Sequence, residues 1–377
     1  MSPDSEPFPW LWPLTAGLQL GAATLEIISK MVAAPVPSGA PCPEEPRWTT
    51  INSVVLDLPA LRVREFAAGH GPPVILVVPF ALHGPVLADL APGHSIVERL
   101  LECGIDRLML VECKSADPRM AFLDVDDYLA QVAVVLNEVG EPAALVGLCQ
   151  GGWLSLMVAA RFPSMVSQLV LVGSPIDLDA ASSSITAAAR AMPLEAFQTI
   201  VENQHGRVIG RWMLDIWNVR TLENSAVSDV LQNPAPSADA LERFRIWHGW
   251  TLDLPGSYYL RVVDDLFRHN RLARGEFLAL GRTLDLARVS IPLYLLAADE
   301  DEVTPAGQVM AAVQLVGTPQ RHIRTARVPG SHLSLFMGAR TLQTAWKDIA
   351  GWLTERKPRA RAGGTTAPFR REPMIWC

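Results

Sequence analysis

A series of short apolar runs separated by helical patterns constrains the fold of this sequence more than any other feature. The runs lie at residues 72–80, 107–113, 143–149, 168–175 and 291–300. Apolar runs of this length are typical of strands buried on both faces, as in a parallel sheet. Helical patterns follow the first three runs. The alternation predicts an α/β fold with a mostly parallel, doubly wound sheet.

The composition excludes several classes of protein. With 49% hydrophobic and 19% charged residues, the chain of 377 residues is expected to fold rather than to remain disordered. The net charge of −7 provides no basic field, so no nucleic-acid partner is expected. Five cysteines are scattered without metal-ligand spacing. We therefore expect free thiols, a reducing cytoplasmic location and no metal site.

The first 47 residues form a separate segment. Apolar residues three and four apart over 13–34 predict an amphipathic helix, and 36–47 is a Pro-rich linker. Polar residues interrupt the apolar stretch and the start is acidic, so neither a membrane span nor a signal peptide is expected. The helix either packs on the body or a homodimer partner, or adheres to a lipid or polymer surface through Trp10 and Trp12.

The remaining chain divides into a core, an insertion and a tail. The core is expected over residues 48–178 and 287–356, interrupted by a helical, aromatic-rich cap at 179–286. Residues 357–377 are basic, rich in Gly and Pro and aperiodic, which predicts a disordered tail.

The third apolar run ends in Gly147-Leu-Cys149-Gln-Gly151-Gly152 and is followed by a helical pattern. A strand, a Gly-x-nucleophile-x-Gly turn and a helix form the nucleophile elbow of α/β-hydrolases. The turn is sharp, so glycine is needed where a Cβ would collide with neighbouring backbone. The helix N-terminus carries partial positive charge, which favours a thiolate at Cys149. A buried structural cysteine beside a tight turn is the alternative.

Other residues complete this expected site. The backbone N–H of Gln150 is one expected oxyanion donor, and the second is expected near Phe80 or Ala81. The candidate pocket residues are His83, His248, Trp247 and Trp250.

The chain order nucleophile, acid, histidine is that of a triad on this fold. Asp299 and Asp301 follow the last apolar run, and both are candidates for the acid. His332 follows a short strand and Pro-Gly, where the fold needs its base. The base would accept the proton of Cys149, and the acid would orient the imidazole.

The stretches "GLCQGGW", "ADEDEVTP" and "VPGSHLSLFMG" resemble the polyhydroxyalkanoate synthases, especially the shorter class that works with a second subunit. The resemblance covers roughly residues 70–355. It implies Cys149 as nucleophile, His332 as base and Asp301, rather than Asp299, as orienting acid. It also implies a hydroxyacyl-CoA or polyester substrate and a location at polymer granules, with CoA as part of the substrate and no other cofactor.

The chain departs from this family pattern at several positions around the expected pocket. The departures are Glu112-Cys113 after the second run, Glu302 after the acid, Trp250 in the cap and Leu82-His83 in the oxyanion loop. They leave a second activity open: hydrolysis by the same triad, as in the related intracellular polyhydroxyalkanoate depolymerases. Cysteine favours acyl transfer, because a thioester on the enzyme stays activated toward an alcohol. Lesser alternatives are a dienelactone-hydrolase-like enzyme and a granule protein with an inactive triad.

Overall fold

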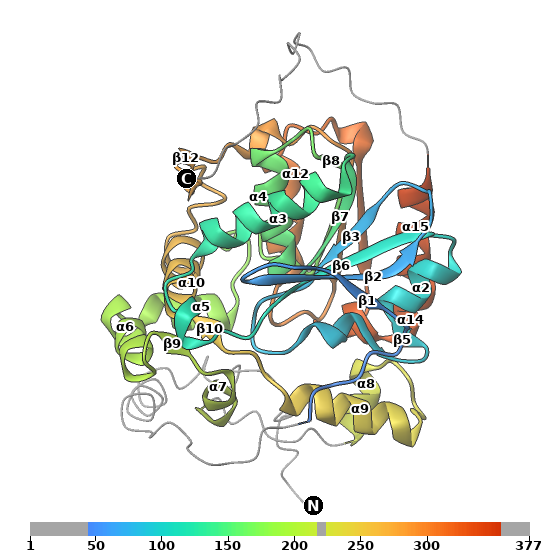
Figure 1. Cartoon of the computed structure of the whole chain (residues 1–377), viewed down its shortest axis with the longest axis horizontal. Coiled ribbons are helices and arrows are strands. Elements are labelled where there is room, and N and C mark those ends of the chain that lie inside the picture. Colours follow the sequence, from blue (N-terminus) through green and yellow to red (C-terminus); the bar gives the residue numbers. More distant parts are fainter. Residues whose placement is uncertain (1–43, 217–223, 356–377) are drawn as a thin grey trace, which may run out of the picture.

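An eight-stranded sheet forms the centre of the structure, which is a computed structural model (Figure 1). Six neighbouring strands are parallel, and β1 and β2 form an antiparallel edge. In spatial order the strands are β1 (Ser53–Asp57), β2 (Leu61–Ala68), β6 (Arg107–Cys113), β3 (Val74–Val77), β7 (Ala143–Leu148), β8 (Val166–Val172), β13 (Leu293–Ala298) and β14 (Ile323–Val328). The predicted mostly parallel α/β sheet is confirmed.

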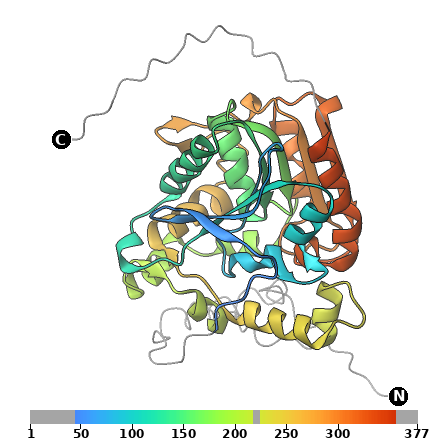
Figure 2. The same ribbon diagram turned by 45° about the vertical axis from the view of Figure 1, so that its right-hand side comes forward.

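Helices cover both faces of this sheet (Figures 1 and 2). Side chains of β3 alternate between two apolar cores: Ile75 packs with α3 and α4, and Leu76 packs with α2 and α15. Every residue of β3 and β7 is buried, which explains why these strands read as unbroken apolar runs. The covering helices are α2 (Ile96–Glu102), α3 (Val125–Val139), α4 (Gln150–Arg161) and α15 (Lys347–Thr354).

Helix α3 illustrates how local sequence sets an element. Asp124 caps its N-terminus, and the side chain of Asp127 bonds back to the backbone of Asp124 in a capping box. Gly140 ends the helix with φ of 78°, a left-handed conformation that glycine adopts without strain.

The chain between β8 and β13 is mostly helical. Most of its helices lie to the left of the sheet and below it in Figure 1. Its larger elements are α5 (Ser184–Ala191), α6 (Leu194–Asn203), α7 (Gly210–Ile216), α8 (Asn224–Val230), α9 (Ala238–Gly249), α10 (Gly256–Arg261) and the π-helix η4 (Val262–Arg268). These elements occupy the range in which a cap is expected.

The structure describes residues 44–216 and 224–355. The expected helix over 13–34, Trp10, Trp12 and the tail 357–377 lie outside the described residues. Within those two described ranges, no helix is long and apolar enough to span a membrane.

Candidate active site

Cys149 lies between strand β7 and helix α4, with φ of 50° and ψ of −119°. A positive φ is uncommon for a residue other than glycine and marks the strained turn of a nucleophile elbow. The backbone N–H of Cys149 donates to the carbonyl of Val172 in β8 over 2.8 Å. This bond fixes the turn to the neighbouring strand and leaves the half-buried thiol at the carboxyl end of the sheet.

The three glycines of the turn permit close packing of backbone. A Cβ on Gly147 would lie 2.3 Å from the Cα of Gly152, and one on Gly151 would lie 2.0 Å from the carbonyl oxygen of Val77. A Cβ on Gly152 would lie 1.7 Å from Oγ of Ser174. Any larger side chain at these positions would therefore push α4 away from the sheet.

His332 and Asp301 meet at the same end of the sheet. Asp301 follows β13 and His332 follows β14, and these two strands are parallel neighbours, so their carboxyl ends adjoin. Nδ1 of His332 lies 2.7 Å from Oδ2 of Asp301, and both side chains are buried. The other carboxylate oxygen of Asp301 accepts from the backbone N–H groups of Val303 and Thr304, at 3.0 and 2.7 Å.

The charges around His332 favour its protonated form. Burial alone would lower the pKa of the imidazole, but the carboxylate of Asp301 and then Cys149 outweigh it and raise the pKa well above its ordinary range. Because Cys149 contributes to this rise, its thiol lies close to the imidazole. The structure therefore places Cys149 beside His332, which is paired with Asp301.

Asp299, the other candidate acid, has a different partner. Its carboxylate accepts a hydrogen bond of 2.7 Å from the guanidinium of Arg327, and its side chain is 42% exposed. The geometry therefore distinguishes the two aspartates, which their positions after the last apolar run alone did not.

Gly173, which was not predicted as a site residue, packs against His332. It follows strand β8 directly with φ of 54°, and a Cβ there would lie 3.2 Å from Cε1 of His332 and 2.8 Å from Leu335. A glycine at the end of an apolar run is the signal that could have revealed this position.

A cavity of about 160 Å³ opens beside the elbow. Phe80, Ala81 and Gln150, the expected oxyanion residues, line its inner end. As the first residue of α4, Gln150 has a backbone N–H with no acceptor within its own helix, so this group can bind an oxyanion. The outer walls are apolar side chains of the segment between β8 and β13.

The same sequence matches the profile of the alpha/beta hydrolase fold family over residues 92–339. The chain belongs to the α/β-hydrolase fold family. A bromoperoxidase from Bacillus anthracis has the same fold, with a TM-score of 0.50 and 17% identity, over 80% of this chain and 99% of that one.

Two curated relatives are poly(3-hydroxyalkanoate) polymerase subunits PhaC. The protein from Synechocystis sp. is 25% identical over 298 residues, which cover 75% of this α/β-hydrolase and 78% of the relative. The protein from Haloferax mediterranei is also 25% identical, over 308 residues, but the match spans only 58% of its length and 75% of this chain. The chain is thus distantly related to these polymerase subunits.

Three expected pocket residues of this α/β-hydrolase do not line the cavity beside Gln150. The ring of His83 packs 4.7 Å from that of Trp247 and 5.0 Å from that of His248, and burial followed by the His248 charge lowers the pKa of His83 to about 3. The indole Nε1 of buried Trp247 donates to the carbonyl of Gly84. These residues pack the oxyanion loop against α9, and their role in a substrate pocket stays a prediction.

Trp250 lines a different cavity of about 300 Å³, together with Glu112 and Cys113. These three residues are departures from the polyhydroxyalkanoate synthase pattern, so the substitutions gather around one space. Glu112 is buried there and pairs with the guanidinium of Arg64 over 3.0 Å. This arrangement indicates a change in local packing rather than a change in the contacts of Cys149.

Among residues 44–216 and 224–355, no group of three or more His, Cys, Asp or Glu side chains could hold a metal ion.

Proposed function

We propose that this α/β-hydrolase transfers a hydroxyacyl group from a CoA thioester to the terminal hydroxyl of a growing polyester, through an acyl group on Cys149. The single observation that carries the proposal is the placement of Cys149 beside the His332–Asp301 pair, at the carboxyl ends of three strands. Distant similarity to polymerase subunits supports the substrate class.

In the first half-reaction, the thiolate of Cys149 attacks the thioester carbonyl. The backbone N–H of Gln150 and one from Phe80 or Ala81 stabilise the tetrahedral oxyanion. The intermediate collapses with release of CoA, whose sulfur takes the proton of the His332 imidazolium. Asp301 holds the imidazole in position throughout.

In the second half-reaction, the hydroxyl at the end of the polyester attacks the thioester on Cys149. His332 accepts the hydroxyl proton, an ester bond forms, and the Cys149 thiolate leaves beside the imidazolium. The first half-reaction replaces the CoA thioester with a thioester on Cys149 at little change in free energy. The acyl group therefore stays activated for the second half-reaction, which makes cysteine a suitable nucleophile.

The proposal extends to location and partners. We propose that the enzyme acts in the cytoplasm at the surface of polymer granules, with a second copy of itself or a second subunit as partner. Residues 1–40 are the segment proposed to adhere to the granule. Their deletion should reduce binding to amorphous polymer particles while activity on a soluble thioester persists.

One assay separates transfer from hydrolysis. Purified protein receives 3-hydroxybutyryl-CoA or 3-hydroxyoctanoyl-CoA in one reaction and amorphous polymer in another. Release of CoA with growth of polymer supports transfer. Release of CoA with free hydroxyacid, or of hydroxyacid from the polymer, would overturn it in favour of hydrolysis. The variant Cys149→Ala should be inactive in every arm.

A further inference from the structure

The cavity beside Gln150 has the form of a pocket for a hydrocarbon chain. Several cap elements supply its walls: for example, Ile185 and Ala188 come from α5, Tyr258 from α10 and Val263 from η4. Apolar clefts with few polar groups are the usual form of binding sites for small apolar ligands.

The cavity lies close to the proposed nucleophile. Phe80 and Gln150 border it, and Gln150 follows Cys149 directly in the chain. Tyr258, which also borders it, packs its ring 5.1 Å from that of Phe80. Burial, then Cys113, then Cys149 raise the pKa of the Tyr258 phenol well above its ordinary range. An acyl group on Cys149 could therefore extend into the cavity.

We propose that this cavity receives the side chain of the hydroxyacyl group, that its size selects a chain of about six carbon atoms, and that Ala188 on α5 sets this limit. The inference rests on the proposed acylation of Cys149. The cavity volume of about 160 Å³ is close to the roughly 150 Å³ of an apolar protein cavity that binds benzene, a ligand of about six carbons. The methyl side chain of a 3-hydroxybutyryl group would leave most of this space empty.

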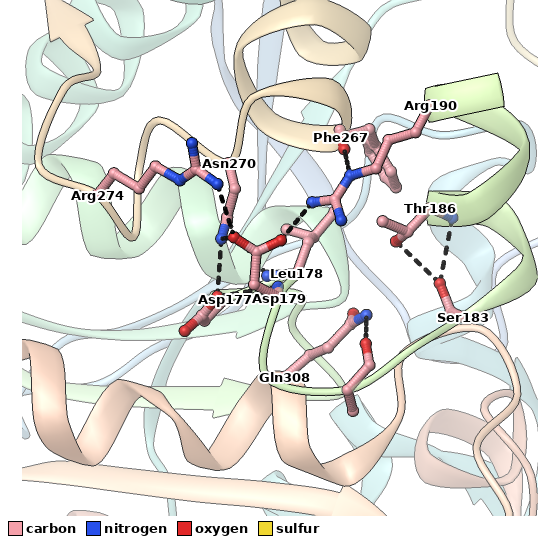
Figure 3. A network of polar contacts seen from close by, with 11 residues as sticks. Asp177, Leu178, Asp179, Ser183, Thr186, Arg190, Phe267, Asn270, Arg274 and Gln308 are labelled. Atoms are coloured by element: carbon pink, nitrogen blue, oxygen red, sulfur yellow. Dashed lines mark hydrogen bonds and ion pairs between the residues drawn. The ribbon is translucent and has the colours of Figure 1, made fainter. Parts of the chain in front are cut away.

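A network of polar contacts fixes α5, so the wall that Ala188 forms is not free to adapt (Figure 3). The guanidinium of Arg190 donates to the carboxylate of Asp179 over 2.6 Å and to the carbonyl of Phe267 in η4 over 3.1 Å. Ser183 caps the N-terminus of the helix by accepting from the N–H of Thr186. The C-terminal end of α5 is therefore held against η4 and Asp179, and its N-terminal end is capped.

The test measures chain-length selectivity of the full chain. CoA release is compared for 3-hydroxybutyryl-CoA, 3-hydroxyoctanoyl-CoA and 3-hydroxydodecanoyl-CoA. Because each buried methylene gains roughly fourfold in binding, kcat/KM for the octanoyl substrate should exceed that for the butyryl substrate by at least about tenfold. The dodecanoyl chain exceeds the cavity and should react more slowly than the octanoyl chain. Equal or better use of the butyryl substrate would overturn the inference.

Two matched variants on the same helix locate the selectivity. Ala188→Phe fills the cavity and should abolish the octanoyl preference, because the rate should fall more for the octanoyl substrate than for the butyryl substrate. Ala187→Phe places the same side chain on the exposed side of α5 and should leave the preference unchanged. If both variants change the preference equally, the inference is wrong. Ala188→Val, a smaller change, should reduce the preference partially and serves if the phenylalanine variant fails to fold.

A second set of substrates separates this inference from the proposed transfer reaction. p-Nitrophenyl butyrate and octanoate report acylation of Cys149 without CoA or polymer. An octanoate preference with no use of CoA thioesters would overturn the transfer function and support the cavity assignment. Polymer growth without any chain-length preference would support the transfer function and overturn the cavity assignment. Failure of every substrate to acylate Cys149 would overturn both.

Discussion

Asp301 and His332 are joined by a 2.7 Å contact between Oδ2 and Nδ1, and Asp299, two residues before Asp301, is bound to Arg327 instead. We therefore predict that Asp301→Asn lowers kcat/KM by roughly 10³- to 10⁴-fold, because an asparagine cannot stabilise the imidazolium or fix its tautomer. Asp299→Asn should change it by no more than about twofold, because the pair with Arg327 is exposed. Rates on one soluble thioester check both variants, and a severe Asp299 variant beside a mild Asp301 variant would contradict the assignment.

A second prediction concerns the thiols. Cys149 is half-buried beside His332, whereas Cys113 is fully buried and burial, with the charge of Glu112, raises the pKa of its thiol. Limited iodoacetamide should therefore alkylate Cys149 before Cys113 and abolish activity at one label per chain. Peptide mass mapping identifies the site. Cys113→Ser should retain the inactivation. Full loss of activity with the label on another cysteine and Cys149 unmodified would exclude Cys149 as the target.

The sequence predicted the strands that are buried on both faces. Runs without alternation mark β3, β6, β7, β8 and β13, because helices cover both sides of these strands. Strands β1 and β2 were not predicted, because they form the antiparallel edge: β1 is mostly exposed and β2 is mostly half-buried. An apolar-run criterion cannot detect such strands.

The parts of the candidate site that depend on a local motif were predicted. The parts that depend on packing between residues distant in the sequence were missed. The Gly-x-Cys-x-Gly-Gly turn and the order of Asp301 and His332 are visible in the chain. Part of the cavity wall is formed by Ala188 and Ala189 of α5, and an alanine in a helical pattern carries no signal for a pocket. The packing of His83 on Trp247 depends on contacts between residues 164 positions apart, which spacing does not reveal.

The pH dependence of stability follows from His332. Its pKa in the native state is raised well above the ordinary 6.5, chiefly because the Asp301 charge outweighs burial. The imidazolium therefore stabilises the native state fully below about pH 6.5, and this contribution is lost as pH rises through the raised native pKa. The difference in unfolding free energy between wild type and His332→Gln should be largest near pH 6 and should shrink toward alkaline pH. Urea unfolding at several pH values measures it. In the Asp301→Asn background the same substitution should show a weaker pH dependence, and an unchanged dependence would show that Asp301 is not the cause.

Glycine at position 173 should matter for activity more than for folding. Its φ of 54° and the nearby imidazole and Leu335 mean that Gly173→Ala strains the backbone and displaces His332. We expect a loss of about 1–3 kcal/mol in stability and a fall in kcat/KM of at least about tenfold. Gly351→Ala is the matched control, since this exposed glycine lies in α15 with open space around its Cα, and it should be neutral or stabilising by about 0.5–1 kcal/mol. Thermal unfolding and rates on folded protein separate the two effects.

Asn270 should be a central support of the network that fixes α5 (Figure 3). This buried side chain donates from Nδ2 to Asp177 over 2.7 Å and to Asp179 over 2.9 Å, and its Oδ1 accepts from the N–H of Leu178. Asn270→Asp keeps the shape but replaces two donors by a third carboxylate, so stability should fall by about 2–4 kcal/mol.

The defect of Asn270→Asp should decrease at acid pH, because protonation of one of the three carboxyls restores a donor. Arg274→Ala provides the comparison within the same network. Its guanidinium also binds Asp179, over 3.1 Å, but its side chain is 54% exposed, so its loss should cost less than about 1 kcal/mol. Denaturant unfolding at two pH values measures all three proteins. Asp179 also binds Arg190 on α5, so Asn270→Asp should in addition weaken the octanoyl preference. A preference equal to that of wild type would show that the network does not control the shape of the cavity.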